Sequence, residues 1–78
     1  MPIAFILVSC ECDSSDLFAA DMKKIPNVEY SLRVSGVYEF FVKVRSDTED
    51  DLKKLVRDIR TSTLVRSSST LMVVKKLV

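Results

Sequence analysis

The sequence predicts a single α+β domain of two layers, in which a four-stranded antiparallel sheet carries two helices on one face. Two segments with a helical spacing of apolar residues alternate with four segments of strand character, in the order βαββαβ. The chain has 78 residues and one glycine, which separates the two middle strands as in a hairpin. A chain of this size forms one domain, so we expect residues 1–78 to fold as a unit.

The first and last strands are expected to be covered on both faces. From Ile3 to Cys10 nearly every residue is apolar, so both alternating sets of side chains are apolar. The last strand, from about Thr70 to Leu77, has the same character until Lys75. Strands of this composition are typical of sheets that are buried on both sides.

Capping residues mark the start of both helices. Asp13, Ser14 and Ser15 precede the first helix, and Ser46-Asp47-Thr48 precedes the second. Pro26-Asn27 ends the first helix. The two apolar stripes consist of Leu17, Phe18, Met22 and Ile25 in the first helix and Leu52, Leu55, Val56 and Ile59 in the second.

The two middle strands form a predicted hairpin around Ser35-Gly36, and the second of them resumes at Tyr38. The alternating apolar sets are Val28, Tyr30, Leu32 and Val34 before the turn, and Tyr38, Phe40, Val42 and Val44 after it. Each half of the chain is a βαβ unit with a right-handed crossover. The predicted strand order is therefore 4-1-3-2, as in ferredoxin-like folds, with both helices on one face.

Two helices cover only one face of this sheet, and the other face is also expected to be apolar. It carries one apolar set from the first strand, one from the last strand, and Phe41. The edge of the hairpin carries the polar residues Glu29, Ser31, Arg33 and Lys43. A contiguous exposed apolar patch usually marks an interface. We therefore expect a homodimer in which two open sheet faces pack together.

Composition disfavours several partners and compartments. With 12 basic and 11 acidic residues, the chain has no electrostatic footprint for nucleic acid or a membrane surface. The apolar run after Met1-Pro2 is too short to span a bilayer and lacks the flanks of a signal peptide. The two cysteines, Cys10 and Cys12, are too few for a disulfide framework and fit a reducing compartment. We expect a cytoplasmic protein.

No residue pattern indicates catalysis, a metal or a cofactor. The sequence has no histidine, no nucleophile–base pairing and no glycine-rich phosphate loop. Cys10-Glu11-Cys12 invites a metal-binding or redox interpretation, but no further soft ligand exists to complete such a site. The run Ser67-Ser68-Ser69-Thr70 is interpreted as a polar approach to an edge strand, with anion binding as the alternative.

The segment from Val34 to Arg45 resembles the hairpin of the effector-binding domain of Lrp/AsnC-type regulators. The family pattern is a turn rich in small residues, then Gly-x-aromatic-acid, here Gly36 to Glu39, and then an alternating apolar strand. The second half of the chain agrees, with a helix, Leu64-Val65-Arg66, three small polar residues, Thr70 and an apolar terminal strand.

The resemblance extends from Ile3 to about Lys76. The family usually has Asp at the position of Glu39, and its regulators usually carry a helix-turn-helix DNA-binding domain before this one. Here the first strand follows Met1 directly, so the chain resembles the stand-alone, RAM-type form of the domain. On this basis we expect no DNA-binding domain and no direct contact with nucleic acid.

The resemblance also implies a function. Domains of this family pair through their sheets into dimers, and the dimers associate into octamers or decamers with an amino acid or similar metabolite at the contact between them. The Gly36 turn and the acid after it contact the ligand, together with residues near the start of the last strand. Carried over by position, the ligand-binding residues are Ser35, Gly36, Val37, Tyr38, Glu39, Ser69 and Thr70. Free backbone N–H groups suit a carboxylate, and an acid suits an ammonium group.

The sequence therefore predicts a non-enzymatic, amino-acid-binding oligomerisation module, with three alternatives. An interaction protein could co-assemble with a full-length Lrp/AsnC-type regulator and modulate its DNA binding without a ligand of its own. A small haem-binding monooxygenase on a dimeric ferredoxin-like barrel is disfavoured, because no histidine is present to ligate haem. An ACT-type amino-acid-binding domain has the same topology, but the Gly36–Glu39 tip and the polar run before Thr70 favour the Lrp/AsnC type.

Overall fold

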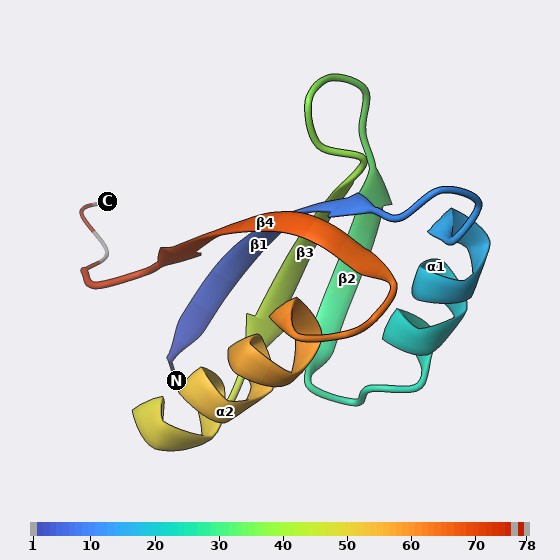
Figure 1. Cartoon of the computed structure of the whole chain (residues 1–78). Coiled ribbons are helices and arrows are strands. Elements are labelled where there is room, and N and C mark those ends of the chain that lie inside the picture. The colour runs from blue at the N-terminus through green and yellow to red at the C-terminus, as the bar shows by residue number, and fades with distance from the viewer. Residues whose placement is uncertain (1, 76, 78) are drawn as a thin grey trace.

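The computed structural model describes residues 2–75 and 77, and its elements follow the predicted order βαββαβ (Figure 1). The elements are β1 (Ile3–Cys10), α1 (Ser15–Lys23), β2 (Val28–Arg33), β3 (Phe40–Arg45), α2 (Glu49–Arg60) and β4 (Val65–Met72). The strands form one antiparallel sheet in the order β2-β3-β1-β4, which is the predicted order 4-1-3-2 read from the other edge. The ferredoxin-like α+β class is therefore confirmed.

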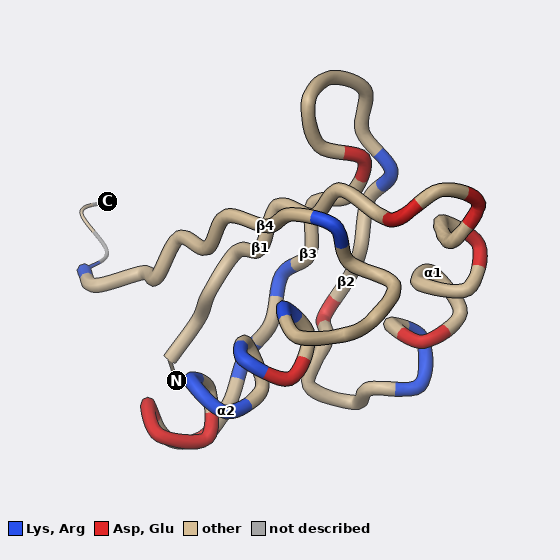
Figure 2. Tube along the Cα trace, in the orientation of Figure 1, with Lys and Arg blue, Asp and Glu red and all other residues tan. Residues whose placement is uncertain are grey.

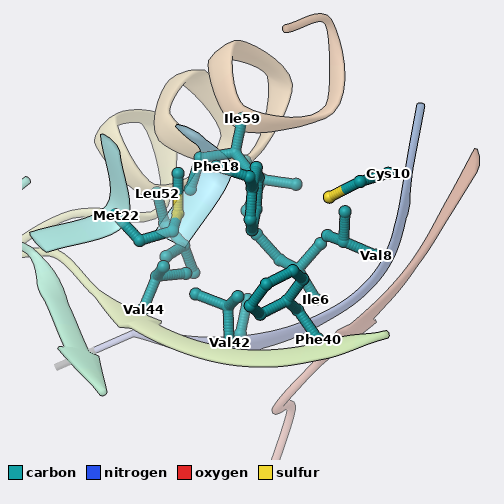
Figure 3. Packing of buried hydrophobic residues seen from close by; sticks show 12 residues of the cluster. Ile6, Val8, Cys10, Phe18, Met22, Phe40, Val42, Val44, Leu52 and Ile59 are labelled. Atoms are coloured by element: carbon teal, nitrogen blue, oxygen red, sulfur yellow. The ribbon is translucent and has the colours of Figure 1, made fainter. Parts of the chain in front are cut away.

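The core lies between the sheet and the two helices (Figure 3). Alternate residues of β1 and β3 point toward the helices and are buried, as the sequence predicts for both strands. Phe18 of α1 packs against Phe40 of β3 with ring centroids 5.1 Å apart. The buried apolar residues are Ala4, Ile6, Val8, Cys10, Phe18, Met22, Phe40, Val42, Val44, Leu52, Val56 and Ile59.

The two helix starts differ in their caps. Thr48 caps α2 as predicted, because its hydroxyl accepts the backbone N–H of Asp51 at 3.1 Å. Ser14 occupies the cap position of α1, but its side chain makes no capping hydrogen bond. The hydroxyl of Ser15 is used elsewhere, at the site described below.

The prediction for the apolar face of β2 was wrong beyond Val28. A β-bulge places Glu29 as an extra residue between the pairs Val28–Val44 and Tyr30–Lys43. A bulge reverses the faces of all later side chains, so Tyr30 and Leu32 point away from the helices. They are 41% and 51% exposed and belong to the open face of the sheet.

The last strand begins earlier than predicted. β4 covers Val65–Met72, and the residues after it are not in a strand within the described part of the chain; Lys76, which the predicted strand included, lies outside the described residues. The three serines in this segment are not among the residues that are enriched in strands. Pairing with the whole length of β1 satisfies their backbone groups, so the tertiary context decides the boundary.

The hairpin connection is longer than predicted, because β3 begins at Phe40 and not at Tyr38. Residues 34–39 form a loop that extends beyond the end of the sheet (Figure 1). Across the described residues, no helix is long and apolar enough to cross a membrane.

Candidate functional site

The loop of residues 34–39 carries five of the seven predicted ligand-binding residues. Gly36 has φ +136°, a conformation that side chains rarely allow, although a Cβ atom there would meet no atom within 4 Å. The glycine is therefore required by backbone conformation and not by space. Val37 is 86% exposed at the tip.

The backbone of this loop offers hydrogen-bond donors. The base is closed by the N–H of Val34, which donates to the carbonyl of Glu39 at 2.8 Å. The N–H groups of the four residues between them donate to no protein acceptor within residues 2–75 and 77. These four consecutive residues are Ser35, Gly36, Val37 and Tyr38.

Hydrogen bonds within the protein hold both the carboxylate and the backbone of Glu39. Its Oε1 accepts the backbone N–H of Cys10 at 3.1 Å, and its Oε2 accepts the hydroxyl of Ser15 at 2.6 Å. Its own N–H donates to the carbonyl of Val8 at 2.8 Å. The carboxylate thus joins the base of the loop to the end of β1 and the start of α1.

These contacts favour the charged form of Glu39. The hydrogen bond from Ser15, followed by the one from Cys10, holds the pKa of the Glu39 carboxyl below its ordinary value of 4.5. The guanidinium groups of Arg33 and Arg66 lower the same pKa through their charge. Figure 2 shows acidic and basic segments next to each other at this base of the loop.

The remaining two predicted residues lie on opposite faces of β4. Ser69 pairs with Leu7 and points to the open face, whereas Thr70 pairs with Ile6 and points toward the helices. The Thr70 Oγ1 atom is inaccessible to solvent and has no hydrogen-bond partner among the described residues. No hydrogen bond between described residues joins Ser69 or Thr70 to residues 34–39, so one chain does not bring the two groups into a single bonded cluster.

Thr70 lies in a groove between α2 and β4, which the sequence analysis did not identify. The groove has a volume of about 580 Å³. It is lined by Lys53, Val56, Arg57, Arg60, Thr61, Ser68, Thr70 and Met72. The spacing of its three cations at i, i+4 and i+7 along α2 is the sequence signal that points to one shared helix face.

One cation of this groove is already oriented. The Nε–H of Arg60 donates to the hydroxyl of Ser68 at 3.0 Å across the groove. Arg57 and Lys53 lie farther toward the start of the helix, and Arg57 has a contact of 4.0 Å with the exposed Asp58. A second groove, of about 460 Å³ between α1 and α2, is lined by charges of both signs, namely Asp21, Lys24 and Asp58.

The open face of the sheet is more apolar than predicted. Phe5 and Phe41 stack at its centre, with ring centroids 5.2 Å apart. The bulge in β2 adds Tyr30 and Leu32, and β4 adds Leu71, which pairs with Phe5. The predicted polar hairpin edge is therefore wrong for β2, where two large apolar residues are exposed.

A charged cluster lies beside this apolar centre. Glu29 accepts from Lys43 at 2.9 Å and from Arg45 at 2.8 Å. The hydrogen bond from Lys43 is the main reason why the pKa of Glu29 is lowered. The Lys43 ammonium also lies 6.0 Å from the Phe5 ring centroid and 5.9 Å from that of Tyr30.

The cysteines form no recognisable metal or redox site. Cys10 is buried, and its burial raises the pKa of its thiol, which disfavours the reactive thiolate. Cys12 is exposed. In the part of the chain that the structure describes, no group of three or more His, Cys, Asp or Glu side chains could bind a metal ion.

Comparison with known proteins places the chain in a family. Residues 3–78 match the model of the Lrp/AsnC ligand-binding domain. The structure superimposes on the crystal structure of FFRP-DM1 with a TM-score of 0.90 and 28% identity, over 95% of this chain and 100% of that one. It also superimposes on the transcriptional regulator NMB0573 of Neisseria meningitidis, in complex with L-Met, with a TM-score of 0.84 and 23% identity, over 97% of this chain and 51% of that one.

A curated relative of another kind also matches. The chain is 31% identical over 74 residues to a homocitrate synthase of Saccharolobus islandicus, an alignment that covers 91% of this chain. It spans only 16% of the length of that enzyme, so the similarity concerns one part of the synthase. The family match covers nearly the whole sequence, and the resemblance seen in the hairpin is confirmed. The chain belongs to the Lrp/AsnC ligand-binding domain family.

Proposed function

We propose that this chain is a non-enzymatic effector-binding module, which binds an amino acid or similar small metabolite and acts as a homo-oligomer. The match of residues 3–78 to a ligand-binding domain carries the proposal. The L-Met complex of the Neisseria meningitidis regulator supports an amino acid as the class of ligand. We treat residues 1–78 as one ligand-binding and oligomerisation domain.

The loop of residues 34–39 suits the polar end of such a ligand. Four consecutive backbone N–H groups that have no acceptor among the described residues provide donors for a carboxylate. Because Glu39 already accepts from Cys10 and Ser15, we assign it the role of fixing the loop. Ser35, Gly36, Val37 and Tyr38 would then contact the ligand directly.

Ser69 and Thr70 lie on opposite faces of β4, so we propose that Thr70, which lines the α2–β4 groove, contributes from a neighbouring copy. Within one chain, no hydrogen bond joins them to the loop among the described residues. A site that uses both groups is completed when the loop of one copy meets β4 of another. Ligand binding at such a contact couples to assembly, because the ligand stabilises the associated form.

The open sheet face provides the surface for a homodimer. The face is apolar at its centre, with the stacked Phe5 and Phe41, and continues into the exposed Leu32 and Leu71. Two such faces packed together would bury the patch. Dimers formed in this way leave the loop free for further association into octamers or decamers.

A thermal-shift screen of the twenty amino acids tests the ligand, and sedimentation velocity over a range of concentrations tests assembly. We expect at least one amino acid to raise the melting temperature of the wild-type chain and to have a reduced effect on Gly36→Val, which distorts the loop. Leu17→Val, an exposed change on α1, is the control. No stabilisation by any amino acid would contradict effector binding, and a monomer at all concentrations would contradict the assembly.

A second candidate function is co-assembly with a full-length regulator of the same family. The Neisseria meningitidis protein contains this fold in 51% of its chain, so a complete regulator would present a matching open face to this one. A pull-down of purified Lrp/AsnC-type regulators by this chain tests it. Capture that persists without amino acids, together with a silent thermal-shift screen, would favour this second function.

A further inference from the structure

The side chains that line the α2–β4 groove make it positively charged, which suits an anion. Among the described residues that line it, three are cations and none is an acid. The groove between α1 and α2 has charges of both signs, so the uniform charge is a property of the α2–β4 groove and not of helix surfaces in general. Arg60 is already turned into the groove by its hydrogen bond to Ser68.

The apolar residues that line the same groove suit a ligand with a short aliphatic chain. Val56 and Met72 provide apolar surface, and the volume of about 580 Å³ lies within the usual range for small-molecule sites. The hydroxyls of Thr61 and Ser68 add neutral polar contacts. A ligand that fits these walls is small, with a negatively charged end and a few carbon atoms.

The loop gives a second, independent constraint on the ligand. Its donors are backbone N–H groups, which suit a carboxylate, and its one acid is occupied by Cys10 and Ser15. The loop therefore offers no unoccupied carboxylate to select a cationic group. Both halves of the proposed site select negative charge.

We propose that the effector is a small dicarboxylate, such as an acidic amino acid, with one carboxylate at the loop of one copy and the other at Arg57 and Arg60 of the α2–β4 groove in the next. This assignment rests on the proposed function, in which the two halves of the site come from different copies. It predicts discrimination by charge: aspartate and glutamate bind, and asparagine and glutamine, which have nearly the same shape, do not.

Isothermal titration calorimetry of the intact chain with these four amino acids and with succinate tests the assignment. Aspartate or glutamate, and succinate, are expected to bind, and Arg57→Gln is expected to weaken that binding by about tenfold or more, since a charge-assisted hydrogen bond is lost. Lys54→Gln is the matched control, because it removes the same charge from α2 at a residue that does not line the groove. Sodium chloride at equal ionic strength controls for general screening.

The outcomes separate the two proposals. If asparagine, glutamine or another neutral amino acid binds as well as aspartate, or if Arg57→Gln and Lys54→Gln behave alike, the dicarboxylate assignment is overturned while effector binding stands. If succinate binds and is lost in Arg57→Gln but no amino acid binds, the groove assignment stands and an amino acid is excluded as effector. If nothing binds, both are overturned.

Discussion

The hydroxyl of Ser15 donates to Glu39 Oε2 at 2.6 Å and thereby joins the first residue of α1 to the base of the β2–β3 loop, 24 positions later in the chain. The other carboxylate oxygen accepts the N–H of Cys10. One glutamate therefore links the base of the loop to the end of β1 and to the start of α1. These two bonds add to the backbone bonds of Val34 and Glu39 that fix the base of the loop.

Replacing Ser15 by Ala should loosen the loop without unfolding the domain. The variant loses the shorter of the two bonds to the Glu39 carboxylate, so we expect a melting temperature a few degrees lower. We also expect faster amide exchange at Val34 and Glu39, the loop residues whose N–H groups donate to protein acceptors. Ser14→Ala is the control, since the Ser14 side chain makes no capping bond. Hydrogen exchange followed by NMR checks this, and equal exchange in both variants would contradict the linking role.

Acidification should remove the contribution of Glu39 to stability. Its pKa is lower in the folded chain than the ordinary 4.5, so the charged form is stabilised by folding. The contribution is complete above the pKa of the unfolded chain and is lost as the pH falls through the lower folded-state value. We expect wild type to be more stable than Glu39→Gln at about pH 7, and the difference to shrink by about pH 3.

Urea unfolding of both proteins at the two pH values measures this difference. Comparison with Glu39→Gln is needed because Glu29 also has a lowered pKa and contributes to acid unfolding in both proteins. A difference that stays constant from neutral to acidic pH would show that the contacts of Glu39 do not depend on its charge.

Gly36 should resist substitution for conformational reasons alone. Its φ of +136° is strained for any side chain, but the space beside it is empty. Gly36→Ala is therefore expected to cost about 1–3 kcal/mol or to change the loop conformation. The neighbouring Ser35→Ala should be nearly neutral. Denaturant unfolding measures the cost, and a neutral Gly36→Ala with unchanged loop chemical shifts would contradict it.

Much of the fold could be predicted because the decisive residues act locally. The nearly all-apolar β1, the capping Thr48 and the two apolar helix stripes determine element type and layer. Right-handed crossovers then determine the strand order. The end of the β2–β3 turn was placed two residues early, since Tyr38 and Glu39 have the alternation of a strand but belong to the loop.

The parts that the sequence did not predict depend on partners distant in the chain. Glu29, the extra residue of the bulge, pairs with Lys43 and Arg45 of β3, and no local sequence pattern indicates the bulge. β4 begins at Val65 because the backbone of β1 is available to pair there. The hydrogen bond from Ser15 to Glu39 and the groove that Thr70 lines likewise arise from packing between elements.

Replacing Thr70 by valine should stabilise the domain. Its Oγ1 is inaccessible to solvent and has no hydrogen-bond partner among the described residues. Burying this hydroxyl therefore costs free energy that no hydrogen bond offsets. Thr70→Val keeps the shape, and we expect a gain of about 1 kcal/mol, or about 4–8 °C in melting temperature. The contrasting control is Thr61→Val, which loses a hydroxyl bond to the carbonyl of Arg57 and should destabilise. Thermal unfolding checks both, and a loss of stability in Thr70→Val would show that the hydroxyl has a partner in solution.

Charge on the open sheet face should separate the copies. Leu71 is 55% exposed in a single chain, and Leu17 on α1 is 60% exposed away from the sheet. Leu71→Glu and Leu17→Glu should therefore each lower the stability of the isolated chain by a similar, small amount. If sheet faces pack together, only Leu71→Glu places a charge in the contact, where burying a leucine is worth about 1.5–3 kcal/mol per copy. Because about 1.4 kcal/mol corresponds to a factor of ten, we expect Leu71→Glu to weaken self-association by tenfold or more. Leu17→Glu should leave self-association unchanged.

Sedimentation equilibrium of the wild type and the variants distinguishes the surfaces. An effect of Leu71→Glu alone would assign the contact to the open face, and the same effect of Leu32→Glu would extend it to the part of β2 that the bulge turns outward. Weakening by Leu17→Glu alone would assign association to the helical face instead. Such a result would leave Phe5 and Phe41 exposed in the assembly, which contradicts the packing argument on which the homodimer rests.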